Sequence, residues 1–207
     1  MPELEFQVEG VESQPFAATP SIHFKLRIRN ADEQAIEAIL LRSQIRIEPA
    51  GRAYNPGEKS ALRDLFGEPQ RWSQTLRSML WAHSTVVVPR FEGSTVIDLP
   101  VACTFDLAVA SAKYFHGLED GDVPLCLLFS GTVFYRSEEG ALQTGQIPWN
   151  KEASYRLPVQ TWRQAIDCHY PNTAWLCLRR DLFERLQQYK TDRGIPTWEQ
   201  ALESILP

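Results

Sequence analysis

The feature that most constrains the fold is an alternation of apolar and polar residues in the first quarter of the chain. Apolar side chains occupy nearly every second position of residues 4–8, 22–28 and 41–47. Successive side chains of a strand point to opposite faces, so this period predicts strands with one buried and one wet face. The turn-forming residues 30–33 separate the second strand from the third. The two therefore form a predicted antiparallel pair.

Later segments include further predicted strands with the same alternation and two regions with helical spacing. Short strands are predicted over 85–88, 94–99, 104–110, 123–136, 143–147 and 153–157. Helical spacing interrupts them at 55–82, where Asn55, Pro56 and Glu58 match a capping box. The buried stripe of that insertion is predicted to hold Leu62, Leu65, Phe66, Trp72 and Leu76, with 79 and 80 continuing it. From 159 onward the apolar spacing is again helical.

These elements define one α+β domain built on an antiparallel β-sandwich. The sandwich is expected over residues 1–158, with the helical insertion at 55–82 inside it. The C-terminal helices of 159–207 are expected to pack on the sandwich, because no Gly/Ser-rich linker precedes them. The 207-residue length suits a single core of this kind.

Charge and hydropathy exclude several classes of partner. The net charge of −5 comes from 26 acidic and 21 basic residues, and no basic stripe is visible, so nucleic acid is not an expected partner. The longest apolar run, 123–129, is far too short to span a bilayer, and no membrane insertion is expected. Residues 1–20 lack the pattern of a signal peptide, so the expected location is the cytoplasm.

No motif predicts catalysis, a cofactor or a metal. The sequence lacks the glycine-rich phosphate loops, the nucleophile elbow and the zinc-protease motif. The cysteines at 103, 126, 168 and 177 have no metal-ligand spacing. We therefore expect four free thiols, no bound metal or cofactor, and no catalytic residues. Ser130-Gly131-Thr132 is interpreted as a bulge or a tight strand crossing.

Aromatic residues beside predicted loops are the candidates for an interface, since tryptophan anchors many protein–protein contacts. Trp149 is the strongest of them, because its proline-containing loop offers few ways to bury a ring, and Lys151 lies beside it. Trp81 and His83, at the predicted end of the insertion, complete the candidate set. The alternative for Trp149 is a core position beneath the C-terminal helices, near Trp162. The alternative for His83 is a structural role as a cation at a helix C-terminus, where it interacts with the helix dipole.

Five stretches also carry a resemblance to a known family. They are residues 64–72, 80–83, 112–118, 123–134 and 148–158. Together they are similar to a bacterial protein family of unknown function whose genes often lie beside those for an oxygen-tolerant nickel–iron hydrogenase. The resemblance implies an accessory role in assembly or stability of that enzyme. It implies no catalytic residues, and the absence of Cys or His motifs argues against a chaperone that binds the metal itself.

The sequence thus predicts a non-catalytic, protein-binding accessory factor, with hydrogenase subunits as the implied partners. The alternative is a chaperone-like binder of unfolded or signal-bearing polypeptide, because a β-rich sheet followed by helices is similar to the secretion chaperone SecB. An enzyme of unidentified class comes third. An exposed apolar patch would favour either binder, and a deep pocket with converging polar groups would favour an enzyme.

Overall fold

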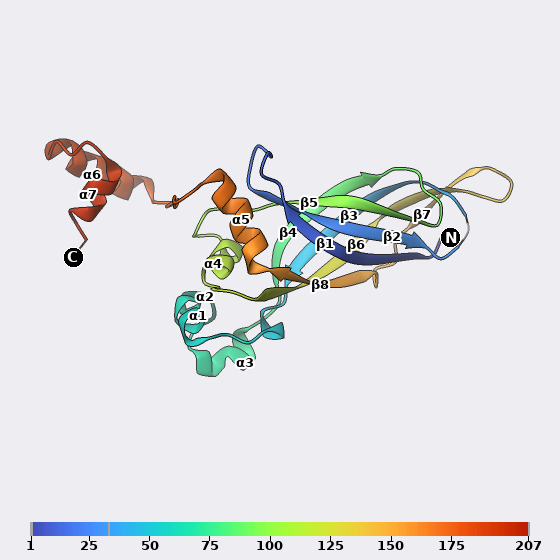
Figure 1. Cartoon of the computed structure of the whole chain (residues 1–207), viewed down its shortest axis with the longest axis horizontal. Helices are drawn as coiled ribbons and strands as arrows, with labels where there is room; N and C mark the ends of the chain where they lie inside the picture. The colour runs from blue at the N-terminus through green and yellow to red at the C-terminus, as the bar shows by residue number, and fades with distance from the viewer. Residues whose placement is uncertain (1, 33, 207) are drawn as a thin grey trace. The chain divides into compact units, whose positions relative to one another are not determined.

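The computed structural model describes residues 2–32 and 34–206, and it divides into two compact units (Figure 1). The first unit, Met1–Ala174, contains all eight strands that the structure describes. The second, Trp175–Pro207, contains two helices. Each unit is described by itself below.

The first unit is a sandwich of two antiparallel sheets. One sheet has three strands in the order β1-β2-β5, and the other has β4-β3-β6-β7, with β8 also paired to β6. The strands are β1 (Leu4–Ser13), β2 (Ser21–Asn30), β3 (Ile36–Ile47), β4 (Met79–Val88), β5 (Ser94–Ala102), β6 (Asp122–Arg136), β7 (Leu142–Gln146) and β8 (Glu152–Pro158). This architecture confirms the predicted α+β sandwich class.

The alternation in the sequence accounts for the core between the sheets. Ile22, Phe24, Leu26 and Ile28 of β2 are completely buried, and Ile39, Leu41, Ile45 and Ile47 of β3 belong to the same core cluster from the other sheet. Burying such side chains contributes roughly 1.5–3 kcal/mol each. The sheets are therefore held together by the residues that the period of two identifies.

Helices close one end of the sandwich, opposite the β6–β7 turn (Figure 1). The helix α4 (Ala110–His116) precedes β6, and α5 (Val159–His169) follows β8. Trp162 of α5 stacks on Phe115 of α4 with 4.9 Å between ring centroids. This finding corrects the strand predicted over 104–110, which is a loop that leads into α4. Phe105 in that loop instead contacts the rings of His116 and Tyr170.

The helical insertion begins earlier and ends earlier than the predicted 55–82. It comprises η1 (Pro49–Gly51), α1 (Pro56–Ala61), α2 (Arg63–Phe66), η2 (Pro69–Arg71) and α3 (Trp72–Thr75). The capping box of Asn55 and Glu58 is present as predicted. Residues 79–82 belong to β4, because Met79 and Leu80 pair with Ile47 and Arg46 of β3. Apolar residues at 76, 79 and 80 fit a helical period, but this strand pairing overrides it.

A buried ion pair fastens the insertion to the sandwich. The Arg52 guanidinium donates to Glu58 at 2.7 Å, and both side chains are almost fully buried. The Glu58 carboxylate also accepts from the backbone N–H groups of Asn55 and Glu119, and Arg52 donates to the carbonyl of Asp120. These bonds offset much of the cost of burying the two charges, although the Nη1 atom of Arg52 is buried without a hydrogen-bond partner. They hold the start of α1 and the loop before β6 to one another.

The second unit consists of α6 (Arg180–Asp192) and α7 (Trp198–Glu203). The Phe183 and Trp198 rings lie 5.4 Å apart, and the hydroxyls of Tyr189 and Ser204 are 3.0 Å apart. Among its described residues only Ala201 is buried. Of the segment predicted to pack on the sandwich, α5 belongs to the first unit and contacts β1 and β2. For 175–207 that packing stays a prediction.

Candidate protein-binding surface

The outer faces of the two sheets differ in how their charges are satisfied. On the three-stranded sheet, which we call the charged face, the Lys25 ammonium lies 2.7 Å from both Glu12 and Asp98. Arg27 pairs with Glu9, and Arg29 lies 3.6 Å from Glu5. Each cation of β2 therefore has a carboxylate on a neighbouring strand. Such exposed pairs contribute little to stability, but they leave few free donors for a partner.

The outer face of the five-stranded sheet, which we call the open face, is different. It is formed by the residues that alternate with the core positions of its strands. They include Leu40, Arg42, Gln44 and Arg46 on β3; Leu80, His83, Thr85 and Val87 on β4; Cys126, Leu128, Ser130 and Thr132 on β6; and Glu152, Ser154 and Arg156 on β8. The open face mixes apolar, basic and neutral polar side chains with the carboxylate of Glu152, so its cations outnumber its carboxylates.

Three arginines of the open face form no ion pairs within the described part of the chain. Arg42, Arg46 and Arg156 form no ion pair with any carboxylate of the described chain. Leu80 and Val87 lie on the same face and are 49% and 70% exposed. Unpaired guanidinium groups beside exposed apolar side chains are the composition that protein interfaces favour.

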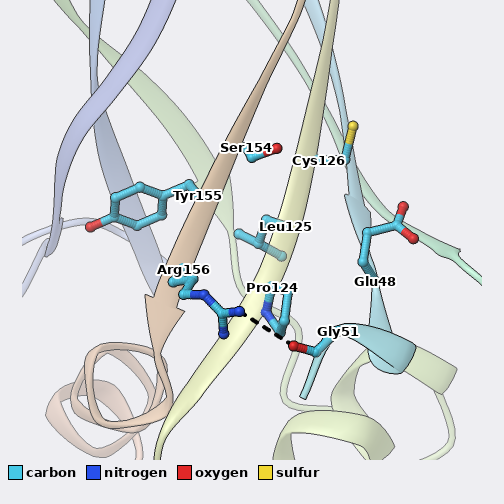
Figure 2. A pocket seen from close by; sticks show the side chains of 8 residues that line it. All are labelled: Glu48, Gly51, Pro124, Leu125, Cys126, Ser154, Tyr155 and Arg156. Carbon is cyan, nitrogen blue, oxygen red and sulfur yellow. Dashed lines mark hydrogen bonds between the residues drawn. The ribbon is translucent and has the colours of Figure 1, made fainter.

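A hollow of about 420 Å³ lies at the end of the open face, between β8 and the turn after β3 (Figure 2). Figure 2 shows Cys126, Ser154 and Arg156 along its wall, where Arg156 donates to the carbonyl of Gly51 at 3.4 Å. Glu48 forms the other side and accepts a hydrogen bond from Ser78. Burial and the carboxylates of Glu152 and Glu48 raise the pKa of the Cys126 thiol. This thiol therefore stays protonated near neutral pH, which makes it a poor nucleophile.

The structure places the four predicted interface residues differently. His83 lies exposed on the open face, opposite Gln44 of β3, in a strand and not at a helix C-terminus. Trp81 turns inward, with its ring centroid 4.9 Å from that of Phe115 and 6.3 Å from that of Phe24. Because its ring packs against the core, Trp81 has little surface to offer a partner.

Trp149 and Lys151 belong to the loop between β7 and β8, at the edge of the same sheet. Trp149 is 92% exposed, so it does not occupy the alternative position in the core near Trp162. Both ends of the loop are bonded to β6: the Ile147 N–H donates to Gly131, and the Phe129 N–H donates to Lys151. The Lys151 side chain pairs with Glu3. The role of either residue in binding stays a prediction.

Groups suited to catalysis do not converge in the part of the chain that the structure describes. No cluster of three His, Cys, Asp or Glu side chains there could hold a metal ion. Burial raises the pKa of the Cys103 thiol to about 12, which keeps it protonated. His116 borders a separate hollow of about 310 Å³, where burial and the Arg163 charge lower its pKa. Lys113, one turn of α4 earlier, pairs with Asp64.

None of the described helices is both long and apolar enough to cross a membrane. The sequence predicted no membrane insertion. The outward position of Arg42 and Arg46 was also predictable, because both alternate with apolar residues of β3. Their lack of carboxylate partners was not, since it depends on which side chains β4 and β6 present beside them.

Comparison with known proteins assigns the chain to a family. Residues 1–207 match the family described as "Family of unknown function (DUF6084)", and the chain belongs to that family. No curated protein matches it.

The solved structures to which the chain is similar are distant. The CARDB domain of a Pyrococcus furiosus protein in complex with di-metal ions is 10% identical, with a TM-score of 0.29 over 76% of this chain and 92% of that one. A protein described as late embryogenesis abundant (LEA) is 15% identical, with a TM-score of 0.34 over 76% and 73%. A β-glucosidase from Kluyveromyces marxianus is 10% identical, with a TM-score of 0.28 over 75% of this chain and 15% of the enzyme. None of these likenesses bears on what this chain binds.

Proposed function

We infer that this protein is a non-catalytic, protein-binding accessory factor, and that its partner binds the open face. The carrying observation is the contrast between the two outer faces. The charged face pairs the cations of β2 with carboxylates, whereas Arg42, Arg46 and Arg156 of the open face have no such partner among the described residues. The partner surface that fits combines carboxylates with apolar side chains.

Binding of a partner would gain free energy at both kinds of side chain on the open face, the arginines and the exposed apolar residues. An arginine without a carboxylate partner in its own chain can use its guanidinium donors for a bidentate bond to a carboxylate of another protein. Leu80 and Val87 already expose apolar area, whose removal from water contributes about 25 cal/mol per Å². On a chain with a net charge of −5, a locally basic face also steers an acidic partner to one side of the molecule.

The family resemblance suggests the partner's identity. Subunits of a nickel–iron hydrogenase are the partners it implies, so an assembly or stabilising role toward that enzyme is the specific form of this proposal. The alternative is a chaperone-like binder of unfolded polypeptide. It is less well supported, because chaperone surfaces accept many sequences through extended apolar area, whereas arginines interrupt the apolar residues here.

Charge reversal on the open face tests the proposal. The double variant R42E/R46E and the control R29E, on the charged face, are each used to capture proteins from native cells, with identification by mass spectrometry. We expect a hydrogenase subunit to bind the unchanged chain and R29E, and R42E/R46E to lose at least about 30-fold in affinity, or about 2 kcal/mol. Equal capture by both variants contradicts the open face as the binding surface.

Trp149 provides an independent test at the edge of the same sheet. Because this ring is 92% exposed, W149A is expected to change the free energy of unfolding by less than about 0.5 kcal/mol. If the ring anchors the partner, the same variant weakens capture by about 2 kcal/mol. Unchanged capture would remove Trp149 from the interface and leave the arginines as its centre.

A further inference from the structure

The hollow beside His116 lies where α4 and α5 meet, at the helical end of the sandwich (Figure 1). Its volume is about 310 Å³, and every residue that lines it belongs to the first unit. The buried side chains of Trp162 and Ile166 form its floor, and the Phe105 ring lies beside that of His116 at its wall. A pocket of this volume is at the lower end of the range that binds small molecules. It therefore suits a compound of few heavy atoms.

The floor of the hollow carries a hydrogen-bond donor that has no acceptor. Trp162 is 2% exposed, yet its indole N–H forms no hydrogen bond with the described residues. Another buried tryptophan, Trp72, donates its N–H to the carbonyl of Gly67 at 2.9 Å. Unlike the enclosed hydroxyl of Ser43, the Trp162 nitrogen is not sealed off by protein atoms, so it is accessible at the hollow that this residue lines. Because buried indole N–H groups usually have a partner, an oxygen atom of a ligand fits this position.

Two opposite charges border the hollow and do not neutralise each other. Arg163 and Asp167 are one helical turn apart on α5, a spacing at which such side chains commonly pair. Neither belongs to an ion pair of the described chain. Arg163 instead donates to the carbonyl of Leu118, and its guanidinium has further N–H groups to offer. The Asp167 carboxylate accepts no hydrogen bond from the described residues.

His116 does not add a third charge. Burial and then the Arg163 charge lower the pKa of His116 from its ordinary value of 6.5, and the Asp167 charge opposes them. The imidazole ring is therefore neutral at pH 7. The hollow thus presents one cation and one anion beside aromatic and aliphatic side chains.

We propose that this hollow binds a free α-amino acid with an apolar side chain. The carboxylate of the amino acid accepts from Arg163 and from the Trp162 N–H, and its ammonium group donates to Asp167. Its side chain contacts Phe105 and Ile166. A zwitterion satisfies both charges of the hollow, whereas a simple anion leaves Asp167 without a partner and a simple cation leaves Arg163 without one. Because the hollow is separate from the open face, this proposal stands independently of the proposed function.

Calorimetric titration of the full chain with three compounds of similar shape tests the proposal. They are L-leucine, 4-methylpentanoate, which lacks the ammonium group, and 3-methylbutylamine, which lacks the carboxylate. L-Leucine is expected to bind with a Kd below about 1 mM, and each analogue at least about tenfold more weakly. The indole N–H resonance of Trp162 is expected to shift when L-leucine binds. No binding of L-leucine at about 10 mM, or an analogue that binds as tightly, overturns the proposal.

Two substitutions assign the charges to their roles. Arg163→Met and Asp167→Asn are each expected to weaken L-leucine binding at least about tenfold. Asp167→Asn is expected to bind 4-methylpentanoate at least as tightly as the unchanged chain does, because this analogue has no ammonium group. Arg90→Met, in the exposed turn between β4 and β5, is the matched control and is expected to bind L-leucine like the unchanged chain.

The two variants differ in their risk to the fold. Arg163→Met also removes the bond to Leu118, so its thermal midpoint is measured first. Asp167→Asn breaks no hydrogen bond or ion pair of the described chain, and therefore tests the site without that complication. An Asp167→Asn chain that binds L-leucine as tightly as the unchanged one contradicts the proposal. So does an equal loss of L-leucine and 4-methylpentanoate binding in this variant.

Discussion

The sandwich and the C-terminal helix pair use the same kind of side chain with opposite results. Trp162 of α5 is buried against the ring of Phe115, whereas Trp198 of α7 is 37% exposed although it contacts Phe183. Both helical segments are amphipathic, and within the first unit α5 packs on β1 and β2 of the sandwich. An amphipathic pattern therefore identifies the apolar face of a helix, but it does not identify the part of the protein, or the other chain, that packs on this face.

The largest change in stability is expected when each of these two tryptophans is replaced by alanine. Trp162→Ala removes a fully packed ring and is expected to lower the free energy of unfolding of the sandwich by about 3–5 kcal/mol. Trp198→Ala is expected to change it by less than about 0.5 kcal/mol, because Trp198 belongs to the second unit and is not a member of the core cluster of buried residues. Urea unfolding followed by circular dichroism measures both. Similar losses in the two variants would show that the helix pair and the sandwich unfold as one.

The sandwich and the C-terminal helix pair each contain a glycine with positive φ, and the two glycines differ in the space around them. At Gly131 of β6, a Cβ atom would lie 2.0 Å from the carbonyl oxygen of Leu40 on the neighbouring strand β3, so the paired strands approach too closely there for a side chain. Gly131→Ala is therefore expected to cost about 2–4 kcal/mol. At Gly194, between α6 and α7, a Cβ atom meets nothing within 4 Å.

Gly194→Ala is thus expected to strain only its own turn, by about 1–2 kcal/mol, and to leave the urea midpoint of the sandwich unchanged. A Gly131→Ala chain as stable as the native one would mean that β3 and β6 can separate at this crossing without loss.

A smaller loss than at Trp162 or Gly131 is expected in the helical insertion, whose apolar stripe is only partly buried. Leu62, Phe66 and Trp72 are buried as predicted, but Leu65 and Leu76 are half-buried. Leu65→Ala is therefore expected to cost about 1 kcal/mol, below the range of fully buried leucines. The thermal midpoint measures it, and Leu62→Ala is the matched control, with an expected loss of about 2–4 kcal/mol. Equal losses would place Leu65 in the core after all.

The sequence predicted most strands because one buried face per strand leaves a period of two. The prediction was wrong where a helical period and a strand period both fit the same residues. Residues 79 and 80 extend the helical stripe, yet pairing with β3 makes them the start of β4. The prediction of a strand near 104–116 was wrong for a related reason. The buried residues of α4 lie on several sides of the helix, so they show no simple period.

The candidate surface was predictable only in part. Exposure of Trp149 followed from its proline-containing loop, and the outward direction of Arg42 followed from alternation. The inward turn of Trp81 depends on an irregularity in the pairing of β3 and β4 between Ile45 and Arg46. No local pattern shows such a shift, because it involves two strands far apart in the sequence.

The double attachment of the β7–β8 loop has a consequence for binding entropy. Bonds to Phe129 and Gly131 hold the loop at both ends, two residues apart on β6. Only residues 148–150 between these bonds remain to be ordered, and Pro148 is already restricted in φ. Immobilising Trp149 in a complex would therefore cost only the rotamer freedom of its own side chain and little backbone freedom. A ring presented in this way can contribute most of its buried area to affinity.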